Sequence, residues 1–276
     1  MYRERPAAGV RGAVVWDSVA VGATPVRVLP DGCLDLLWSS HAGLLVAGPD
    51  RTAHLSVSVP GERWVGLRLP PGTGPAVFGV PAEELRDRRV PLADLWGRPA
   101  VDLAERLAVA AEAGPPRRPG GAAGPAAPGR TGSSTGQLHA APGDVGAPDW
   151  PGRAEPVAAG LEAVAVARLR VAGGVDPLGV RVAARLAAGA TVAATAAEVG
   201  LGARALHRRS HALFGYGPKT LARILRMHRA LDLARAGTPL AEAAARAGYA
   251  DQAHFTREVK DLAGAPPTQL LPPGRA

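Results

Sequence analysis

The stretch TPLAEAAARAGYADQAHFTREVKDLAG, residues 238–264, contains two short segments of helical character separated by a glycine turn. The alanine-rich first segment ends at Gly248, and the second begins after Asp251, whose carboxylate suits a helix N-cap. In the second segment Phe255 and Val259 are four residues apart and share one helical face. The stretch therefore predicts two helices joined by a tight turn, the second packed through Phe255 and Val259.

An earlier part of the chain has the same layout. It reads TVAATAAEVGLGARALHRRSHALFG, residues 191–215, with a turn at Gly200 and a second segment after it. Thr191 in this copy and Thr238 in the later one are both expected to cap the first helix of their pair. Helix, tight glycine turn and helix, with small residues where the helices cross, is the pattern of a helix-turn-helix, and here it occurs twice.

A third helix is expected between the two copies, in GPKTLARILRMHRALDLARAG, residues 217–237, with Pro218 near its first position. A continuous helix of about 17 residues would be about 25 Å long. It would hold the two motifs roughly one DNA turn apart, about 34 Å, so that both second helices reach successive major grooves on one face of the duplex. Arg223, Arg226 and Arg229 recur every three positions on this helix, and either a solvated face or phosphate contact fits that spacing.

Charge is concentrated in the same part of the chain. From Leu178 to the end there are 12 Arg and 2 Lys against 6 acidic residues, whereas the first 177 residues have equal numbers of basic and acidic side chains. The whole formal charge of +8 therefore lies in the last hundred residues. A basic region joined to a neutral remainder indicates a polyanionic partner such as nucleic acid.

A single helix-turn-helix can also be ordinary packing in an all-α protein. The duplication, the localised charge and the polar faces of both second helices favour DNA binding instead, since Arg, Gln, Asn and His pair with base edges in the major groove. The run GYADQAHFTREVKDLAGAPPTQL, residues 248–270, resembles the second half of the AraC/XylS-type DNA-binding domain. The run from Glu198 to Leu231 resembles the first motif and connecting helix of the same family, and the resemblance covers residues 182–271.

Carried over residue by residue, this resemblance implies two sets of groove residues. The first recognition helix contributes Arg204, His207 and Arg208. The second contributes Gln252, Ala253, Thr256 and Arg257, to which its own polar pattern adds His254 and Lys260 as phosphate contacts. Arg208 and Arg257 suit a guanine edge and Gln252 an adenine. Ser210 and Val259 stand where the family usually has Phe, so both recognition helices are expected to pack less firmly than in relatives.

The N-terminal half has a different pattern. Short β-branched segments separated by turn residues run from about Gly12 to Pro70, as in a small antiparallel barrel or sandwich. A helix follows from Pro99 to Ala113, with Val101, Leu103, Leu107 and Ala111 available for packing. The segments VRVLPDGCLDLLW, LLVAGPD and WVGLRLPPG resemble the N-terminal domain of a subgroup of AraC-like regulators, which implies a cupin-like fold.

The expected fold class is α+β with two domains: an N-terminal cupin-like small β-barrel or sandwich, and a C-terminal all-α tandem helix-turn-helix with a connecting helix. The predicted parts are a β-rich regulatory domain with a terminal helix (1–113), a disordered Gly/Pro/Ala linker (114–153), a helical connector (154–175) and the AraC-type DNA-binding domain (176–276). The linker composition cannot bury enough apolar surface to offset the entropy of ordering it.

Catalytic and metal sites are not expected. The β-rich region has His41 and His54 but no His-x-His pair for a cupin metal site. Cys33 lies beside Asp31 and Asp35, and neighbouring carboxylates raise a thiol pKa, so a buried structural cysteine is expected there. No cofactor is expected.

Three classes of function remain open. The first is a sequence-specific transcriptional regulator whose N-terminal domain binds a small-molecule effector or a partner subunit. The second is a non-specific architectural DNA binder, and the third a DNA repair or modification enzyme fused to this domain, against which the single cysteine argues. The expected partner is double-stranded DNA, with a second copy of the chain as a further candidate and RNA polymerase if the protein activates transcription. No signal peptide or membrane span is recognised, so a cytoplasmic location is expected.

Overall fold

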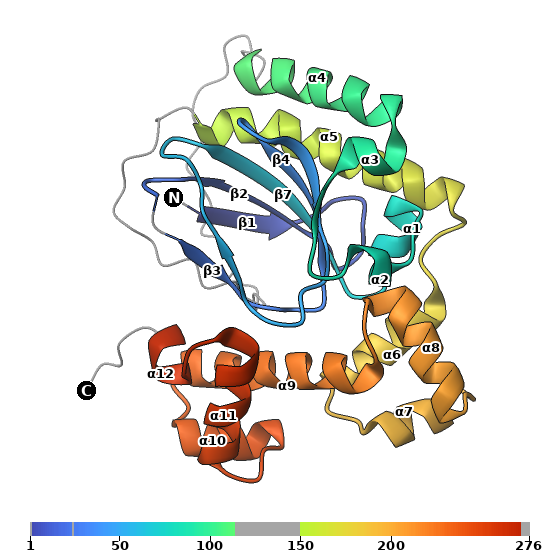
Figure 1. Ribbon diagram of the computed structural model, residues 1–276, viewed down its shortest axis with the longest axis vertical. Coiled ribbons are helices and arrows are strands. Elements are labelled where there is room, and N and C mark those ends of the chain that lie inside the picture. The colour runs from blue at the N-terminus through green and yellow to red at the C-terminus, as the bar shows by residue number, and fades with distance from the viewer. Residues whose placement is uncertain (1, 24, 114–149, 272–276) are drawn as a thin grey trace, which may run out of the picture.

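The computed structural model describes residues 2–23, 25–113 and 150–271 (Figure 1). The predicted linker falls mostly on residues 114–149, which lie outside the described residues. The N-terminal half contains a six-stranded antiparallel sheet, built in the order β1 (Tyr2–Pro6), β2 (Val14–Val19), β7 (Arg63–Leu69), β4 (Leu34–Ser39), β5 (Gly43–Ala47) and β8 (Arg89–Pro91). A separate two-stranded sheet pairs β3 (Val26–Val28) with β6 (His54–Ser56).

Alternation along the strands determines which face of the large sheet is covered. In β4, Leu34, Leu36 and Trp38 point to the face that carries the main N-terminal core, whereas Leu37 belongs to a small cluster on the opposite face. The end strands β1 and β8 do not pair with one another in the described part of the chain, so the large sheet is open.

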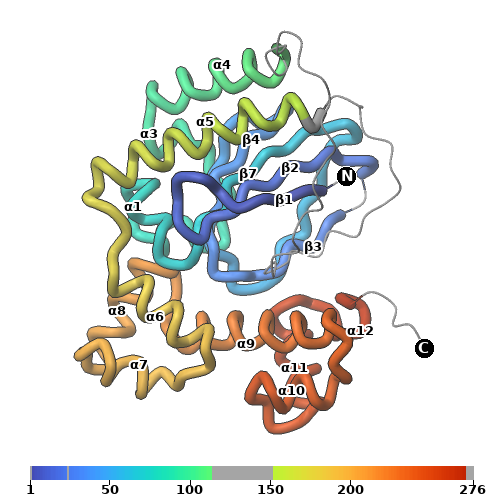
Figure 2. Tube along the Cα trace, turned by 180° about the vertical axis from the view of Figure 1, so that it is seen from behind, coloured from blue at the N-terminus to red at the C-terminus, as the bar shows by residue number. Residues whose placement is uncertain are grey.

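Helices cover the core face of the sheet. The short helices α1 (Gly74–Phe78), α2 (Ala82–Leu85) and α3 (Leu92–Trp96) precede α4 (Arg98–Ala113), and the long helix α5 (Trp150–Val171) crosses the sheet beside α4 (Figure 2). The absence of a side chain at Gly160 lets the two long helices approach, because a Cβ atom there would lie 2.4 Å from a methyl group of Leu107. Helix α5 therefore belongs to the packing of the N-terminal half.

Four details of the N-terminal half differ from the sequence prediction. Strands β1 and β8 were not expected, because YRERP is charged and RVP is only three residues long. In α4 the packing positions are Ala100, Leu103, Leu107 and Ala111, while Val101 is 39 % exposed. The helix expected as a connector begins at Trp150, inside the range expected as linker, and packs on the sheet instead of standing between domains.

The C-terminal half is entirely helical in the described residues. Its elements are α6 (Pro177–Ala187), α7 (Val192–Glu198), α8 (Ala203–Phe214), α9 (Pro218–Arg235), α10 (Leu240–Ala247), α11 (Gln252–Ala263) and α12 (Pro267–Leu270). Helix α9 runs below the sheet, with α6 to α8 at one end and α10 to α12 at the other (Figure 1). Two helix-turn-helix units, α7–α8 and α10–α11, are thus joined by one straight helix, which confirms the α+β fold class with a β-rich N-terminal half.

The predicted caps are mostly correct. Thr191 Oγ1 accepts a hydrogen bond from Ala194 N at 3.1 Å, and Asp251 Oδ1 accepts one from His254 N at 2.6 Å. The turn glycines adopt the left-handed conformation, with φ of 68° at Gly200 and 86° at Gly248. The prediction for Thr238 was wrong: α10 begins after Pro239, which takes the N-cap position in an extended conformation and leaves the threonine outside the helix.

Candidate nucleic-acid interface

The first recognition helix, α8, has one buried and one exposed face. Its core positions are Leu206, Ser210, Leu213 and Phe214. The three predicted groove residues Arg204, His207 and Arg208 are all exposed on the same helix. The structure therefore leaves Arg204 and Arg208 free to contact a duplex, while the His207 ring packs 4.6 Å from that of His211; the roles of all three stay predictions.

The second recognition helix, α11, is packed in the same manner. Phe255 and Val259 are completely buried, as their spacing predicted. Among the predicted contacts, Gln252, Ala253, Arg257 and Lys260 are exposed, and Thr256 and His254 are half-buried. The His254 ring packs edge-on against Tyr249 with centroids 5.2 Å apart, so this residue also helps to pack the turn.

Basic side chains without a partner are concentrated on these two helices. Within the described residues of 178–271, the basic side chains that make no hydrogen bond or ion pair are Arg181, Arg204, Arg208, Lys219, Arg257 and Lys260. Four of them lie on α8 and α11. A neighbour in α8, Arg209, instead pairs with Asp176 at 2.6 Å. Most of the unpaired basic charge that is available for phosphates and base edges in this region is therefore on the recognition helices.

Arg223 and Arg226 of α9 contact the recognition helix α11, a role that their spacing did not suggest. Arg226 and Arg223 both donate to the Glu258 carboxylate, with shortest distances of 2.7 and 2.9 Å. Tyr249 Oη donates to the same carboxylate at 2.9 Å, and the Arg226 guanidinium lies 4.4 Å from the centre of the Tyr249 ring. This cluster fixes α11 and its preceding turn to the connecting helix.

Glu258 is 6 % exposed, and its ionisation depends on these donors. Burial acts to raise the pKa of the Glu258 carboxyl, but hydrogen bonds from the two guanidinium groups and the Tyr249 hydroxyl outweigh it. The pKa therefore lies below its ordinary value, and the ionised form is the one that the fold stabilises.

Arg229, the third arginine of the series, joins two helix ends. Its Nη1 atom donates to Ala187 O at 2.6 Å and its Nη2 atom to Ala247 O at 2.8 Å. Ala187 and Ala247 are the last residues of α6 and α10, where backbone carbonyls lack partners within the helix. One guanidinium group therefore caps a helix of each half of the C-terminal region.

Ser210, which stands where the family usually has Phe, is 1 % exposed, and its Oγ atom has no hydrogen-bond partner in the described part of the chain. A buried hydroxyl without a partner is destabilising. This agrees in direction with the expected weaker anchorage of α8. Val259 is completely buried, and the Glu258 cluster adds an anchor beside it that the resemblance did not imply.

The N-terminal half contacts the carboxyl-terminal ends of both recognition helices. Arg86 Nη1 donates to the carbonyl of Gly215, the C-cap of α8, at 2.7 Å. At the end of α11, Ala53 N donates to Leu262 O at 2.7 Å, and Arg27 Nη1 donates to Ala263 O at 2.7 Å. Each recognition helix thus ends on hydrogen bonds from the N-terminal half.

Buried contacts strengthen this junction near the middle of α9. His228 is 3 % exposed and its Nε2 atom lies 2.7 Å from the Pro30 carbonyl oxygen, which assigns the proton to Nε2. Leu29, from the N-terminal half, is 2 % exposed and belongs to the hydrophobic core of the C-terminal half. Sequence patterns cannot reveal these contacts, because they join segments about 200 residues apart.

Cys33 is partly buried, and the pKa of its thiol is raised well above the ordinary value, first by burial and then by the Asp31 carboxylate. The direction of this shift agrees with the effect expected of the neighbouring carboxylates, but Cys33 is only partly buried, whereas a buried cysteine was expected. In the residues that the structure describes, no three His, Cys, Asp or Glu side chains come together as a metal site. None of the helices in the same ranges is both long and apolar enough to cross a bilayer.

The comparison with protein families decides the nature of the C-terminal half. Residues 195–272 match a family model described as a helix-turn-helix domain, and they run from within α7 past the end of α11. This region is an AraC-type DNA-binding domain. The chain is accordingly a DNA-binding transcriptional regulator with a separate N-terminal domain. Residues 13–91 match a second model, described as a domain of unknown function, which covers most of the β-rich half.

Solved structures similar to this chain include those of ToxT from Vibrio cholerae. A ToxT variant from strain SCE256 is 8 % identical with a TM-score of 0.46, and 93 % of this chain and 96 % of that one are covered. ToxT from strain O395 is 9 % identical with a TM-score of 0.44 and 99 % of each chain covered. At these values the likeness says nothing of function here. No curated protein matches the chain.

Proposed function

We propose that the protein is a sequence-specific regulator that inserts α8 and α11 into successive major grooves of one duplex. The observation that carries this proposal is the distribution of unpaired basic side chains, four of which lie on the two recognition helices. Helix α9, with 18 residues, is about 27 Å long at 1.5 Å per residue. That length suits two motifs about one helical turn of DNA apart.

Recognition of a particular DNA sequence depends on which side chains of α8 and α11 can pair with base edges. Arg208 and Arg257 are exposed and have the fork geometry that binds a guanine edge through two hydrogen bonds. Gln252, at the first position of α11, suits an adenine edge. A non-specific binder would need only phosphate contacts, so these side chains favour a regulator over an architectural protein.

Regulation through the N-terminal half follows from its contacts with both recognition helices. Arg86 holds the end of α8, while Ala53 and Arg27 hold the end of α11. A ligand or partner that displaced the N-terminal half would therefore change the position of both helices together. This gives an N-terminal effector a physical route to DNA affinity.

Replacement of Arg257 tests the sequence-specific part of the proposal. Arg257→Ala is expected to weaken binding to the preferred duplex by about 1–3 kcal/mol and to relax the preference at one base pair. Fluorescence anisotropy at one salt concentration measures the affinities for the preferred and the random duplex. The ratio of these two affinities shows whether Arg257 reads a base. An equal loss for both duplexes would make Arg257 a phosphate contact and contradict base reading.

Arg246→Ala is the matched control, because it removes the same charge from α10. Arg246 is exposed, and within the described residues its one ion pair is with Glu242, at 3.6 Å. Its removal is expected to leave the ratio of specific to non-specific affinity unchanged.

A further inference from the structure

A groove of about 580 Å³ lies beside the first recognition helix, where α8 and the start of α9 meet the N-terminal half. Its lining includes His207 and His211 from α8, Lys219 from α9, and Arg51 and Arg86 from the N-terminal half. No carboxylate is among the described residues that line it. His207, which is predicted to contact DNA, therefore shares this groove with two basic residues of the N-terminal half, Arg51 and Arg86.

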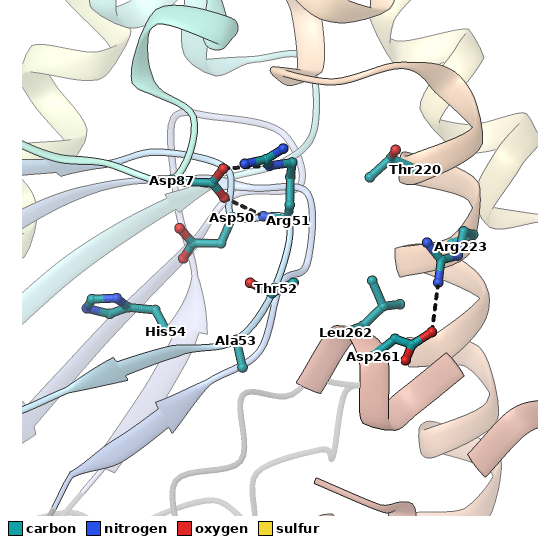
Figure 3. Close-up of a pocket in the computed structure, with 10 residues that line it drawn as sticks. All are labelled: Asp50, Arg51, Thr52, Ala53, His54, Asp87, Thr220, Arg223, Asp261 and Leu262. Carbon is teal, nitrogen blue, oxygen red and sulfur yellow. Dashed lines mark hydrogen bonds and ion pairs between the residues drawn. The ribbon is translucent and has the colours of Figure 1, made fainter. Parts of the chain in front are cut away.

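A second groove, of about 570 Å³, continues toward α11 (Figure 3). Residues 50–54 form its wall on the side of the N-terminal half, and Arg223 of α9 and Asp261 of α11 face them. Arg51 and Thr220 line both grooves. Arg51 of the N-terminal half therefore lies beside α9, between the groove near α8 and the groove near α11.

The Arg51 side chain is held in place on one edge only. Its backbone N donates to Asp87 Oδ1 at 2.8 Å and its Nε to Asp87 Oδ2 at 2.6 Å, as Figure 3 shows. Within the described residues its two terminal nitrogens make no hydrogen bond, and the side chain is 58 % exposed. The guanidinium is oriented while its outer edge stays available, which is the geometry that a phosphate accepts.

Asp87, which orients Arg51, has an unusual backbone. With φ of 57° it is the one residue other than glycine, in the described part of the chain, that has a positive φ. Such a conformation is unfavourable for most residues, although Asp tolerates it better than bulky ones. The strain sits at the residue that fixes a guanidinium between the two recognition helices.

Arg86, which lines the groove beside α8, makes a contact between the two halves. Its Nη1 atom is occupied by the Gly215 carbonyl, so it joins the domains. Lys219 is exposed at the start of α9 and makes no hydrogen bond or ion pair with the described residues. Within the described residues Lys219 is therefore an unpaired cation of the groove, whereas Arg51 pairs with Asp87 through Nε and keeps only its two terminal nitrogens available.

We propose that Arg51, oriented by Asp87, binds a DNA phosphate between the two recognition helices, with Lys219 as its neighbour, so that the N-terminal half forms part of the DNA interface. This rests on the proposed function, because a duplex with α8 and α11 in successive grooves must pass along α9. A small organic anion would also suit a basic groove. DNA is favoured because His207 lines the same groove and because both Arg51 and Lys219 are exposed.

The test compares the salt dependence of DNA binding for the full-length protein and two variants. Arg51→Gln removes the charge but keeps a group that can still donate to Asp87. The control, Arg106→Gln, removes an exposed charge from α4, at the opposite end of the molecule from the DNA-binding helices (Figure 1). Affinities for the preferred duplex and a random duplex are measured from low to moderate salt, and circular dichroism checks folding.

Arg51→Gln is expected to weaken both duplexes by the same factor and to reduce the slope of log K against log salt by about 1, while Arg106→Gln leaves both unchanged. An unchanged slope for Arg51→Gln would overturn the inference. A second result would also overturn it. In that result inorganic phosphate raises the melting temperature of the wild type but not of Arg51→Gln, while the two proteins bind DNA equally. Failure of the wild type itself to prefer any duplex would instead contradict the proposed function.

Discussion

At the scale of single residues, Glu258 shows how a buried charge positions a recognition helix. Its carboxylate accepts hydrogen bonds from two arginines of α9 and from Tyr249, and its pKa is held below the ordinary value although burial opposes this. A group with a lowered pKa in the folded state stabilises the fold above its unfolded pKa, and the contribution disappears as the pH falls through the folded pKa. The anchorage of α11 is therefore expected to weaken in acid.

Glu258→Gln is expected to reduce the free energy of unfolding by about 2–3 kcal/mol near pH 7, because two partly buried guanidinium groups lose their counter-charge. The difference from wild type should shrink as the pH falls through the lowered pKa of Glu258, because the wild-type carboxyl then also becomes neutral. Urea unfolding at a series of pH values measures both effects.

Glu242→Gln serves as the comparison for this experiment, since Glu242 and Arg246 form an exposed pair on α10. It should change stability by well under 1 kcal/mol at every pH. If Glu258→Gln lost the same free energy of unfolding at every pH, the shape of the side chain would matter at this site and its charge would not.

At the scale of elements, Arg229 links the two halves of the AraC-type domain. It caps α6 and α10 through separate nitrogens of one planar group, and a lysine ammonium on a single stem cannot reproduce that geometry. Arg229→Lys should therefore lower the free energy of unfolding by roughly 1–2 kcal/mol and weaken DNA binding. Thermal unfolding and DNA affinity measured on the same sample test this.

Arg235→Lys is the control for the capping role, because Arg235 pairs with Asp232 inside the same helix at 2.6 Å and makes no hydrogen bond or ion pair with a second element among the described residues. It should leave DNA affinity near the wild-type value. Equal losses of affinity in the two variants would contradict a linking role for Arg229.

The sequence predicted those structural features that depend on a few neighbouring residues. The turn glycines, the Asp251 cap and the Phe255–Val259 spacing are properties of a few consecutive residues, and the structure confirms them. Arg223, Arg226 and Arg229 show the limit. Their spacing placed them near one face, but their acceptors come from α6, α10 and α11, which only the tertiary fold brings together.

The candidate site was predictable to the same extent. Resemblance and polar pattern identified exposed residues on α8 and α11, while half-buried Thr256 and His254 show that neighbouring positions on a helix differ in access. Arg51 could not be found, because it lies about 150 residues before α8, in a strand-rich segment with no helical pattern.

At the scale of the whole molecule, the two halves form one hydrogen-bonded unit. The N-terminal half caps the ends of both recognition helices, and Leu29 enters the C-terminal core. It also borders both grooves along α9. The N-terminal half is thus in a position to affect DNA binding through helix orientation and, by our inference, through direct contact with a phosphate.

The central claim is that α8 and α11 read one face of a duplex together. Selection of bound sequences from a pool of random duplexes, with the full-length protein, tests it most directly. We predict enriched sequences with two blocks of preferred bases whose centres are about 10–10.5 base pairs apart. Enrichment of a single block, or no enrichment while the protein still binds DNA, would contradict the claim.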